Sequence, residues 1–202
     1  MRDEKSSSKF IKRLGDLLID PIRFFEEVRG EGLSTAFIFF LKVTTILSIT
    51  TPIVNYYGIE STDFSSSYQA QIMAYRILKS VLIERYGIYA YPIESLLILG
   101  LACIILILGA LFLHLIYRLI GGKGSFLNAW KSMCYGVGPC IFGGFLPYIS
   151  LFAAFYSVMF QIYIGPKVLY KAKESRAIIL LAIIIALIFI EMFVTGTTVE
   201  FW

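Results

Sequence analysis

Three ionisable side chains lie inside apolar runs that are long enough to cross a bilayer: Lys42, His114 and Glu191. A charge at the bilayer centre costs at least ~2.5–3.5 kcal/mol, so such groups are functional hypotheses by default. Lys42 would lie about 12 Å from the inner end of its run and Glu191 about 21 Å from the inner end of its own, which argues against a direct pair. Two interpretations stay open for all three: an interfacial or interhelical hydrogen bond, or a solute or proton path past Glu191.

Catalytic and metal-binding patterns are weak in this chain. The three cysteines Cys103, Cys134 and Cys140 could be combined with His114, but no ligand spacing supports a metal site. The sequence contains no H-E-x-x-H, no G-x-S-x-G and no paired intramembrane aspartates. The Gly121-Gly122-Lys123-Gly124 loop lacks the spacing and the preceding strand of a phosphate loop. We therefore expect no enzymatic activity, no cofactor and no metal.

Helix-breaking residues gather in the apolar stretch from Ser125 to Ser150. Proline has no N–H to donate and its ring opposes the carbonyl four residues back, so Pro139 predicts a kink or break between Tyr135 and Phe142. Neighbouring helices can satisfy the freed backbone groups inside a membrane. The glycines nearby predict a hinge and a close approach by the second or fourth apolar run; the candidate hinge residues are Gly136, Gly138, Pro139, Gly143 and Gly144.

A basic loop separates the last two apolar runs, with Glu174 as its one acidic residue. Each cation near an anionic membrane surface is worth about 1 kcal/mol. The loop is therefore a candidate site for lipid head groups, although it could also serve only to orient the protein. Its cations are Lys167, Lys171, Lys173 and Arg176.

The elements that would hold these residues are α-helices of a polytopic membrane protein. The chain has 202 residues, 58% of them hydrophobic, and its charged residues cluster between apolar runs. We predict an all-α fold with five transmembrane helices and no nucleic-acid partner. The predicted spans cover residues 33–56, 95–120, 126–146, 148–164 and 177–197.

Two further segments flank the first span. Residues 1–32 form an amphipathic region in which Asp20 and Pro21 predict the cap and first position of a short helix that ends at Gly30. This region either lies in the membrane interface or packs on the inner ends of the spans. Residues 57–94 form an external loop, and Ser65-Ser66-Ser67 could cap an amphipathic helix within it.

The distribution of cations indicates the orientation. Fourteen Lys and Arg fall on the side of the N-terminus and three on the other side, with Lys42 inside a span. By the positive-inside rule the N-terminus is cytoplasmic and the C-terminus external. Only two Asn and three Gln occur, which is typical of a thermophilic prokaryote and suggests a prokaryotic cell membrane.

Three local patterns resemble the Yip-domain family, the Ypt/Rab-interacting proteins and their prokaryotic relatives. They are Asp20-Pro21-Ile22-Arg23-Phe24-Phe25; Gly122-Lys123-Gly124-Ser125-Phe126 leading to Tyr135-Gly136, Pro139, Gly144 and Leu146-Pro147; and Gly165 followed by Lys171-Ala172 and Arg176-Ala177. The resemblance covers most of residues 19–197. It implies five spans, a cytoplasmic N-terminus and, in eukaryotic members, a role in vesicle traffic through membrane proteins and small GTPases. The short N-terminal tail and the absence of an Asp-Leu-Tyr-Gly-Pro element argue against GTPase binding here.

Two functions follow as expectations. The first is a non-enzymatic integral membrane protein that acts through membrane-protein partners or a homo-oligomer, or that shapes the lipid bilayer. The alternative is a small oligomeric permease or channel for an ion or small solute, in which the broken third span and Glu191 line a cavity.

Overall fold

The computed structural model describes the backbone of residues 2–57, 77, 79–145 and 150–198, and the side chains of residues 9–52, 77, 79–144 and 152–190. The described backbone consists of helices and short connections, with no strand among these residues. This agrees with the all-α class. The predicted amphipathic helix after Ser65 and the junction between the predicted spans 126–146 and 148–164 lie outside the described residues.

The N-terminal region forms two helices at an angle to each other. α1 spans Arg2–Ile19 and α2 spans Pro21–Glu27, followed by the 3₁₀ turn η1 at Val28–Gly30. The Asp20 side chain accepts a hydrogen bond from the Arg23 backbone N–H at 3.1 Å, and Pro21 takes the first helical position, where its missing N–H costs nothing. The predicted cap and the predicted end at Gly30 are thus confirmed.

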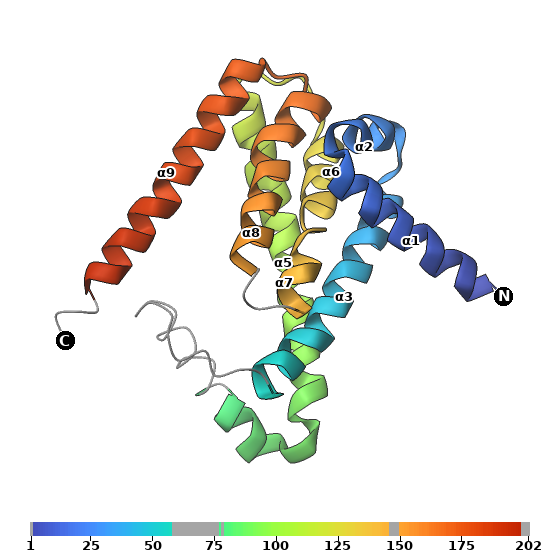
Figure 1. Cartoon of the computed structure of the whole chain (residues 1–202), viewed down its shortest axis with the longest axis vertical. Helices are drawn as coiled ribbons and strands as arrows, with labels where there is room; N and C mark the ends of the chain where they lie inside the picture. Colours follow the sequence, from blue (N-terminus) through green and yellow to red (C-terminus); the bar gives the residue numbers. More distant parts are fainter. Residues whose placement is uncertain (1, 58–76, 78, 146–149, 199–202) are drawn as a thin grey trace.

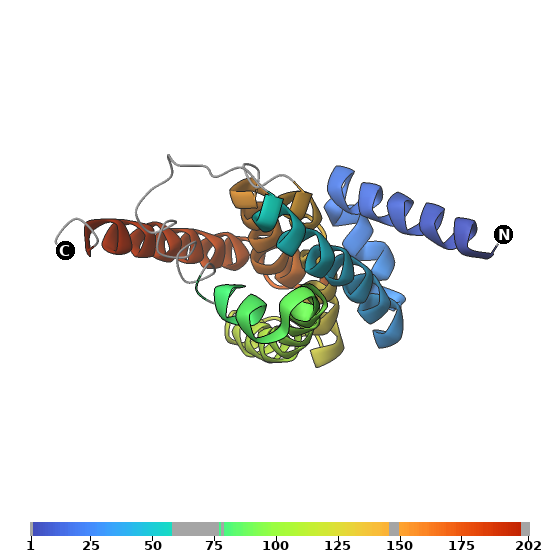
Figure 2. The same cartoon turned by 90° about the horizontal axis from the view of Figure 1, so that it is seen from below.

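The remaining helices form a bundle from which α9 departs (Figure 1). α5 packs against α6 and α3, α7 lies between α3 and α8, and α9 contacts η4 before it runs away from the other helices. The view from below shows α1 and α9 projecting from opposite sides of this bundle (Figure 2). The helices are α3 Leu33–Tyr57, η2 Gly87–Tyr89, α5 Ala90–Leu119, α6 Phe126–Gly136, α7 Cys140–Phe145, α8 Ser150–Met159, η4 Phe160–Leu169 and α9 Glu174–Thr198.

Three helical segments among the described residues are long and apolar enough to cross a membrane: Leu33–Pro52, Lys79–Leu119 and Phe152–Leu169. Five crossings therefore remain a prediction. Many large apolar side chains on the outer faces of α5 and α9 are exposed, as expected for helices that contact lipid acyl chains rather than water. Among them are Leu101, Ile104, Leu108, Phe112, Leu115, Ile179, Ile183 and Leu187.

The predicted break in the third span is present. α6 ends at Gly136 and α7 begins at Cys140. Short-range bonds carry the backbone across the gap: the Gly138 N–H donates to the Tyr135 carbonyl at 2.9 Å and the Cys140 N–H to the Val137 carbonyl at 3.0 Å. The break therefore follows from Pro139 and its flanking glycines, while a hinge role for them remains a prediction.

The neighbour that we predicted for Gly144 is wrong. A Cβ atom at Gly144 would lie 2.4 Å from Cδ2 of Leu47 and 3.1 Å from Oγ1 of Thr50, both on α3. The close approach is thus made by the first predicted span and not by the second or fourth at this position. The missing side chain lets the α3 surface sit directly against the α7 backbone.

The predicted end of the fourth span is also wrong. Gly165-Pro166 does not stop the helix, which continues to Leu169 as the π-type segment η4. Pro166 lies inside this segment, in which the backbone bonds reach back five residues instead of four. Gly165 serves packing instead, because a Cβ there would lie 2.1 Å from Oγ of Ser132.

The second span begins earlier than predicted, at Ala90 rather than residue 95. Pro92 lies in the first turn of α5, where a backbone N–H has no intrahelical acceptor, so it does not interrupt the helix.

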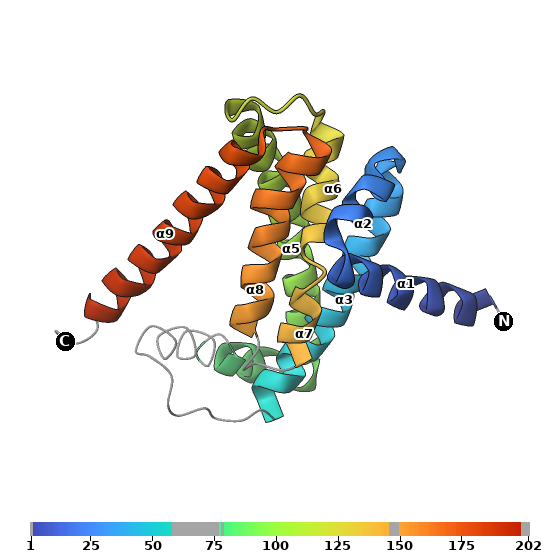
Figure 3. The ribbon, with the colours of Figure 1, turned by 45° about the horizontal axis from the view of Figure 1, so that its top comes forward.

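The N-terminal region lies against the bundle at α2 (Figure 3), and the buried core extends from there into α3, α5, α6 and η4. Phe24, Phe25 and Val28 are buried there, and the Phe25 ring contacts the rings of Tyr135 and Phe160. α2 therefore packs on the bundle. α1 packs there through Phe10, Leu14 and Leu17 and leaves Ile11 and Ile19 exposed.

Candidate functional site

His114 of α5 binds the residue that follows η4. Its Nδ1 atom and the Tyr170 hydroxyl form a hydrogen bond, and the Tyr170 hydroxyl also donates to the Ser125 carbonyl at 2.7 Å. Burial raises the pKa of Tyr170 to about 12, so the hydroxyl keeps its single proton. Since a carbonyl can only accept, the Tyr170 proton goes to Ser125 and His114 donates from Nδ1. The geometry thereby places a proton on Nδ1 of His114.

Tyr117, one turn further along α5 than His114, also joins α5 to other helices. The buried Tyr117 hydroxyl donates its one proton to the Gln161 carbonyl. Ser132 Oγ, which lies 2.8 Å from this hydroxyl, therefore donates to it. We call His114, Tyr117, Ser132 and Tyr170 the tyrosine cluster. It joins α5, α6 and η4 at the end of the bundle where α5 and η4 finish.

The glycine loop between α5 and α6 lies directly on the tyrosine cluster. A Cβ at Gly122 would lie 2.8 Å from the Tyr170 Cβ, and a Cβ at Gly124 would lie 2.6 Å from the Tyr170 Cγ. The Lys123 N–H donates to the Tyr170 carbonyl at 2.8 Å. The glycines in this loop therefore serve close packing against a ring, and the loop makes no phosphate cradle.

A carboxylate joins the N-terminal region to α6. Arg13 Nη2 donates to both carboxylate oxygens of Glu31, at 2.9 and 2.8 Å, and to the Tyr135 hydroxyl at 2.8 Å. The Tyr135 hydroxyl donates to Glu31 Oε2 at 2.5 Å. The Arg13 guanidinium also lies over the Tyr135 and Phe24 rings, 5.4 and 5.7 Å from their centroids. We call Arg13, Glu31 and Tyr135 the carboxylate cluster.

Beside the carboxylate cluster lies a buried lysine. Lys131 of α6 is 1% exposed, and its Nζ donates to the Arg29 carbonyl at 2.6 Å, so it binds the end of η1. Lys131 is one of the fourteen cations on the side of the N-terminus, and the carboxylate cluster was not predicted from the sequence. The available signals were a lysine six residues into an apolar span and a tyrosine hydroxyl deep in the same span.

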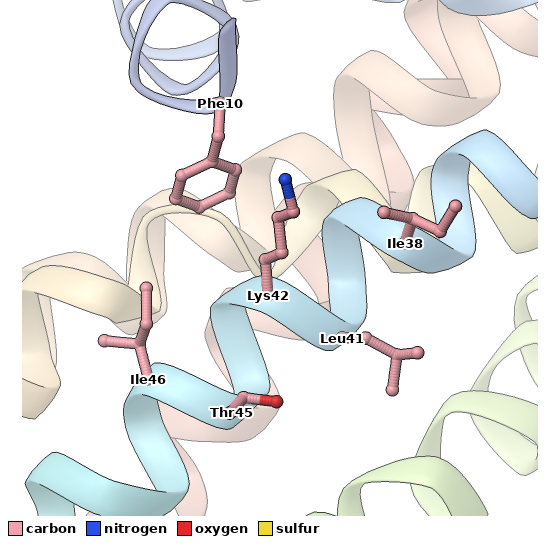
Figure 4. Close-up of a pocket in the computed structure, with 6 residues that line it drawn as sticks. All are labelled: Phe10, Ile38, Leu41, Lys42, Thr45 and Ile46. Atoms are coloured by element: carbon pink, nitrogen blue, oxygen red, sulfur yellow. The ribbon is translucent and has the colours of Figure 1, made fainter. Parts of the chain in front are cut away.

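Lys42 lies on α3 beside the N-terminal region. Its Nζ is 5.6 Å from the centroid of the Phe10 ring of α1, a cation–π contact across the two helices. It also lines a groove between these helices (Figure 4). Lys42 thus contacts α1, whereas His114 contacts Tyr170. Glu191 lies within α9, and its side chain is outside the described residues.

Two of the four candidate head-group residues form hydrogen bonds with other parts of the chain. Lys167 Nζ on η4 donates to Glu174 Oε1 at 2.5 Å and to the Tyr163 hydroxyl at 3.1 Å. The Tyr163 hydroxyl also donates to Glu174, and the hydrogen bonds from Lys167 and Tyr163 lower the pKa of Glu174. Arg176 donates to the Ile120 carbonyl at 3.0 Å. Lys171 and Lys173 are exposed on the connection to α9.

The candidate hinge residues are packed rather than open. A Cβ at Gly136 would lie 2.4 Å from Cγ of Gln161, and one at Gly138 would lie 2.5 Å from Cδ2 of Leu17. Pro139 is buried, and Gly143 is half-buried on α7. In the part of the chain with described side chains, no three His, Cys, Asp or Glu residues gather as metal ligands.

The two polar clusters are suited to holding helices together. The tyrosine cluster and the carboxylate cluster have each hydroxyl paired with an acceptor, and neither contains a nucleophile next to a general base. Their chemistry is that of interhelical hydrogen bonds in an apolar surrounding, where an unpaired group would be costly.

Comparison with known proteins gave one match. The family model described as the Yip1 domain matches residues 15–195. No curated protein and no solved structure matches the chain.

Proposed function

Because this chain belongs to the Yip1-domain family, we propose that it is an integral membrane protein without enzymatic activity that acts through membrane-protein partners or by shaping the bilayer. Partners would be other membrane proteins or further copies of the chain. The observation that carries this proposal is the way in which the N-terminal region is held: one end of α1 is anchored and the rest is presented.

The anchor of α1 is formed by its second half and by α2. Leu17, Phe24 and Phe25 are buried, and Arg13 pairs with Glu31 and Tyr135. The N-terminal end of α1 projects from the bundle (Figure 1), and Lys9, Ile11 and Lys12 are exposed on this helix. An amphipathic helix that is fixed at one end offers a rigid face to a partner or to the lipid interface.

The proposed topology has five crossings with a cytoplasmic N-terminus and an external C-terminus, in a prokaryotic cell membrane. The cation distribution supports the orientation, because the three cations between α3 and α5 oppose fourteen on the other side. α6 and α7 would then cross as one broken span, and α9 as the last. The presented face of α1 would lie at the cytoplasmic surface.

The described residues do not favour a permease. The break at Pro139 borders an apolar groove of about 400 Å³ lined by Leu18, Phe142, Phe152, Ala153 and Tyr156, and no Asp, Glu, Lys, Arg or His among the described side chains lines it. A path for an ion would need polar groups or water at this depth.

Photocrosslinking in native membranes tests the proposal. A photoreactive residue replaces Ile11 on the presented face of α1, where the side chain is 67% exposed. Leu108 on the outer face of α5 is 61% exposed and serves as the matched control. We expect discrete protein adducts from position 11 and lipid adducts from position 108, together with copurification of the same protein in mild detergent.

A second measurement covers membrane shaping. Vesicles that carry the purified chain are imaged by electron microscopy and tested for solute leakage against empty vesicles. Tubules or strongly curved vesicles would support shaping as the activity. A clean monomer with neither adducts nor any change in vesicle shape would refute the proposal, and leakage above the empty control would favour the permease.

A further inference from the structure

Two connections that are distant in sequence lie side by side at one end of the bundle (Figures 1 and 3). One joins α5 to α6, and the other joins η4 to α9. The Lys123 N–H donates to the Tyr170 carbonyl at 2.8 Å, and Arg176 Nη1 donates to the Ile120 carbonyl at 3.0 Å. These bonds fix the two connections to each other, so that side chains from both share one surface.

Five exposed cations lie on this surface, and we call them the basic cap. They come from the last turn of α5, the loop after it, the connection after η4 and the first turn of α9. The residues are Arg118, Lys123, Lys171, Lys173 and Arg176. The structure thus adds Arg118 and Lys123 to the predicted head-group candidates, and it leaves out Lys167, which binds Glu174.

Little negative charge lies near the basic cap in the sequence. Residues 95–173 contain no Asp or Glu, and Glu174 already accepts hydrogen bonds from Lys167 and Tyr163. Among the described side chains, no ion pair involves a cation of the basic cap. Cations that are held on one surface repel each other, so an anion bound among them is stabilised.

Lys171 has an unusual backbone conformation. Its φ angle of 53° is the one positive value among the described non-glycine residues. A side chain makes this left-handed conformation unfavourable, whereas glycine adopts it readily. The Lys171 side chain is exposed, so burial does not offset the cost. Strained residues of this kind cluster at functional sites.

The basic cap lies where two predicted membrane crossings end. The helical segments that are long and apolar enough to cross a membrane include one that ends at Leu119 and one that ends at Leu169. Large exposed apolar side chains begin beside the cations, since Leu119 is 84% exposed and Ile179 is 58% exposed. A border between exposed cations and exposed apolar groups is expected at the level of lipid head groups.

We propose that the basic cap binds an anionic phospholipid with two phosphate groups, one at the α5–α6 connection and the other at the η4–α9 connection. Its acyl chains would lie along the exposed apolar faces of α5 and α9. Basic surfaces between the cytoplasmic ends of membrane helices bind head groups of this kind. Arg176 joins the two halves of the cap, because its guanidinium has five N–H donors and the Ile120 carbonyl accepts one of them.

A lipid fits this surface better than a soluble anion does. Free phosphate, or an acidic protein segment that approaches from water, would pair with the cations and gain nothing from Leu119 and Ile179. An amphiphile satisfies both the charged and the apolar parts. The site needs no protein partner, so its failure would leave the proposed function standing.

Native mass spectrometry of the full chain in neutral detergent tests this site. The protein is titrated with cardiolipin, phosphatidylglycerol or phosphatidylcholine, which have the same acyl chains and are compared at equal phosphate concentration. We expect the wild type to bind cardiolipin more tightly than phosphatidylglycerol, because the two linked phosphates bind together. Phosphatidylcholine, which has no net charge, should bind most weakly.

Variants in both halves of the basic cap should weaken this binding. Lys123→Gln and Lys171→Gly should each lower the affinity for cardiolipin about fivefold, and the double variant about 25-fold, since each cation near such a head group contributes about this factor. Lys171→Arg should retain the affinity. Lys12→Gln on α1 is the matched control, because it removes an exposed lysine outside the cap and should behave as wild type.

Lys171→Gly also separates lipid binding from stability. Glycine relieves the left-handed conformation, so the thermal midpoint in detergent without added lipid should equal or exceed that of wild type, while the affinity for cardiolipin falls. A lysine that served only the fold would lower the midpoint when replaced. If Lys171→Gly fails to fold, Lys173→Gln takes its place in the double variant.

Several results would overturn the proposal. They are equal affinity for cardiolipin and phosphatidylglycerol at equal phosphate concentration, wild-type affinity in the double variant, an equal loss in Lys12→Gln, and complete displacement of the lipid by millimolar inorganic phosphate. Displacement of cardiolipin by poly-glutamate at low micromolar concentration would assign the basic cap to an acidic protein segment instead.

Discussion

The hydroxyl of Tyr135 joins three parts of the chain that are distant in sequence. It accepts from Arg13 of α1 and donates to Glu31, which precedes α3, while its ring packs against Phe24 and Phe39. Each of these polar groups would be left partly unpaired in an apolar surrounding if the hydroxyl were removed. This oxygen atom therefore contributes to the stability of the N-terminal anchor, beside the buried Leu17, Phe24 and Phe25.

Tyr135→Phe should destabilise the protein by about 1–3 kcal/mol, the cost of leaving buried charged partners short of a hydrogen bond. The measurement is the midpoint of thermal unfolding in detergent. Tyr89→Phe is the matched control, because Tyr89 is 71% exposed and should tolerate the same change. Equal midpoints for Tyr135→Phe and wild type would contradict a stabilising role for the carboxylate cluster.

His114 allows a second prediction, because another side chain can supply an N–H donor at the position of Nδ1. The amide nitrogen of asparagine lies near the position of Nδ1, so His114→Asn should keep the bond to the Tyr170 hydroxyl. His114→Leu removes the donor and should lower the thermal midpoint more than His114→Asn does. Should both variants unfold together, the bond to Tyr170 would have no separate stabilising effect.

Among the elements, the π-type segment η4 brings the fourth and third predicted spans into direct contact. Its Gly165 lies against Ser132 of α6 and the hydroxyl of Tyr117, at distances that leave no room for a methyl group. The same segment accepts the tyrosine-cluster bond at the Gln161 carbonyl. η4 thus directs Gly165 and the Gln161 carbonyl toward α5 and α6.

Gly165→Ala should destabilise the protein by about 1–3 kcal/mol, since overpacking forces neighbouring groups to shift. Gly100→Ala on α5 is the control: a Cβ there meets nothing within 4 Å, and alanine should stabilise the helix by up to about 1 kcal/mol. Unfolding in a denaturing detergent titration would rank the two variants against wild type. The reverse order would show that η4 does not pack on α6 in this way.

The elements differ in how far local sequence rules predict them. Apolar runs, the Asp20 cap and the Pro139 break follow from residues within a turn or two of each other, and the structure has all of them. Gly165-Pro166 shows the limit, because the same dipeptide ends an α-helix or lies within a π-helix according to what packs beside it. The contact between Glu31 and Tyr135 joins residues 104 positions apart, and no local pattern encodes such a pairing.

At the scale of the whole molecule, the arrangement of helices predicts which loops share a side of the membrane. The 30 residues of α5 extend about 45 Å, which exceeds the ~30 Å hydrocarbon core of a bilayer. η2 precedes this helix, and the loop that follows it binds the segment between η4 and α9. Ile88 and Lys171 should therefore face opposite sides of the membrane.

Cysteine labelling tests this topology in intact cells. The native Cys103, Cys134 and Cys140 are first replaced by alanine. Ile88→Cys, at a position that is 81% exposed, should react with a membrane-impermeant maleimide from outside, whereas Lys171→Cys should react only after permeabilisation. Labelling of both from the same side would exclude the proposed crossing by α5.

The separation of 104 residues between Glu31 and Tyr135 also sets an order of events during synthesis. At ~5–20 residues per second, Tyr135 leaves the ribosome about 5 to 20 s after Glu31. In that interval Arg13 and Glu31 can pair, but the third member of their cluster does not yet exist. α1 and α2 therefore remain undocked at the membrane surface during this interval. A translocon or chaperone that binds the nascent chain would contact them there before they dock.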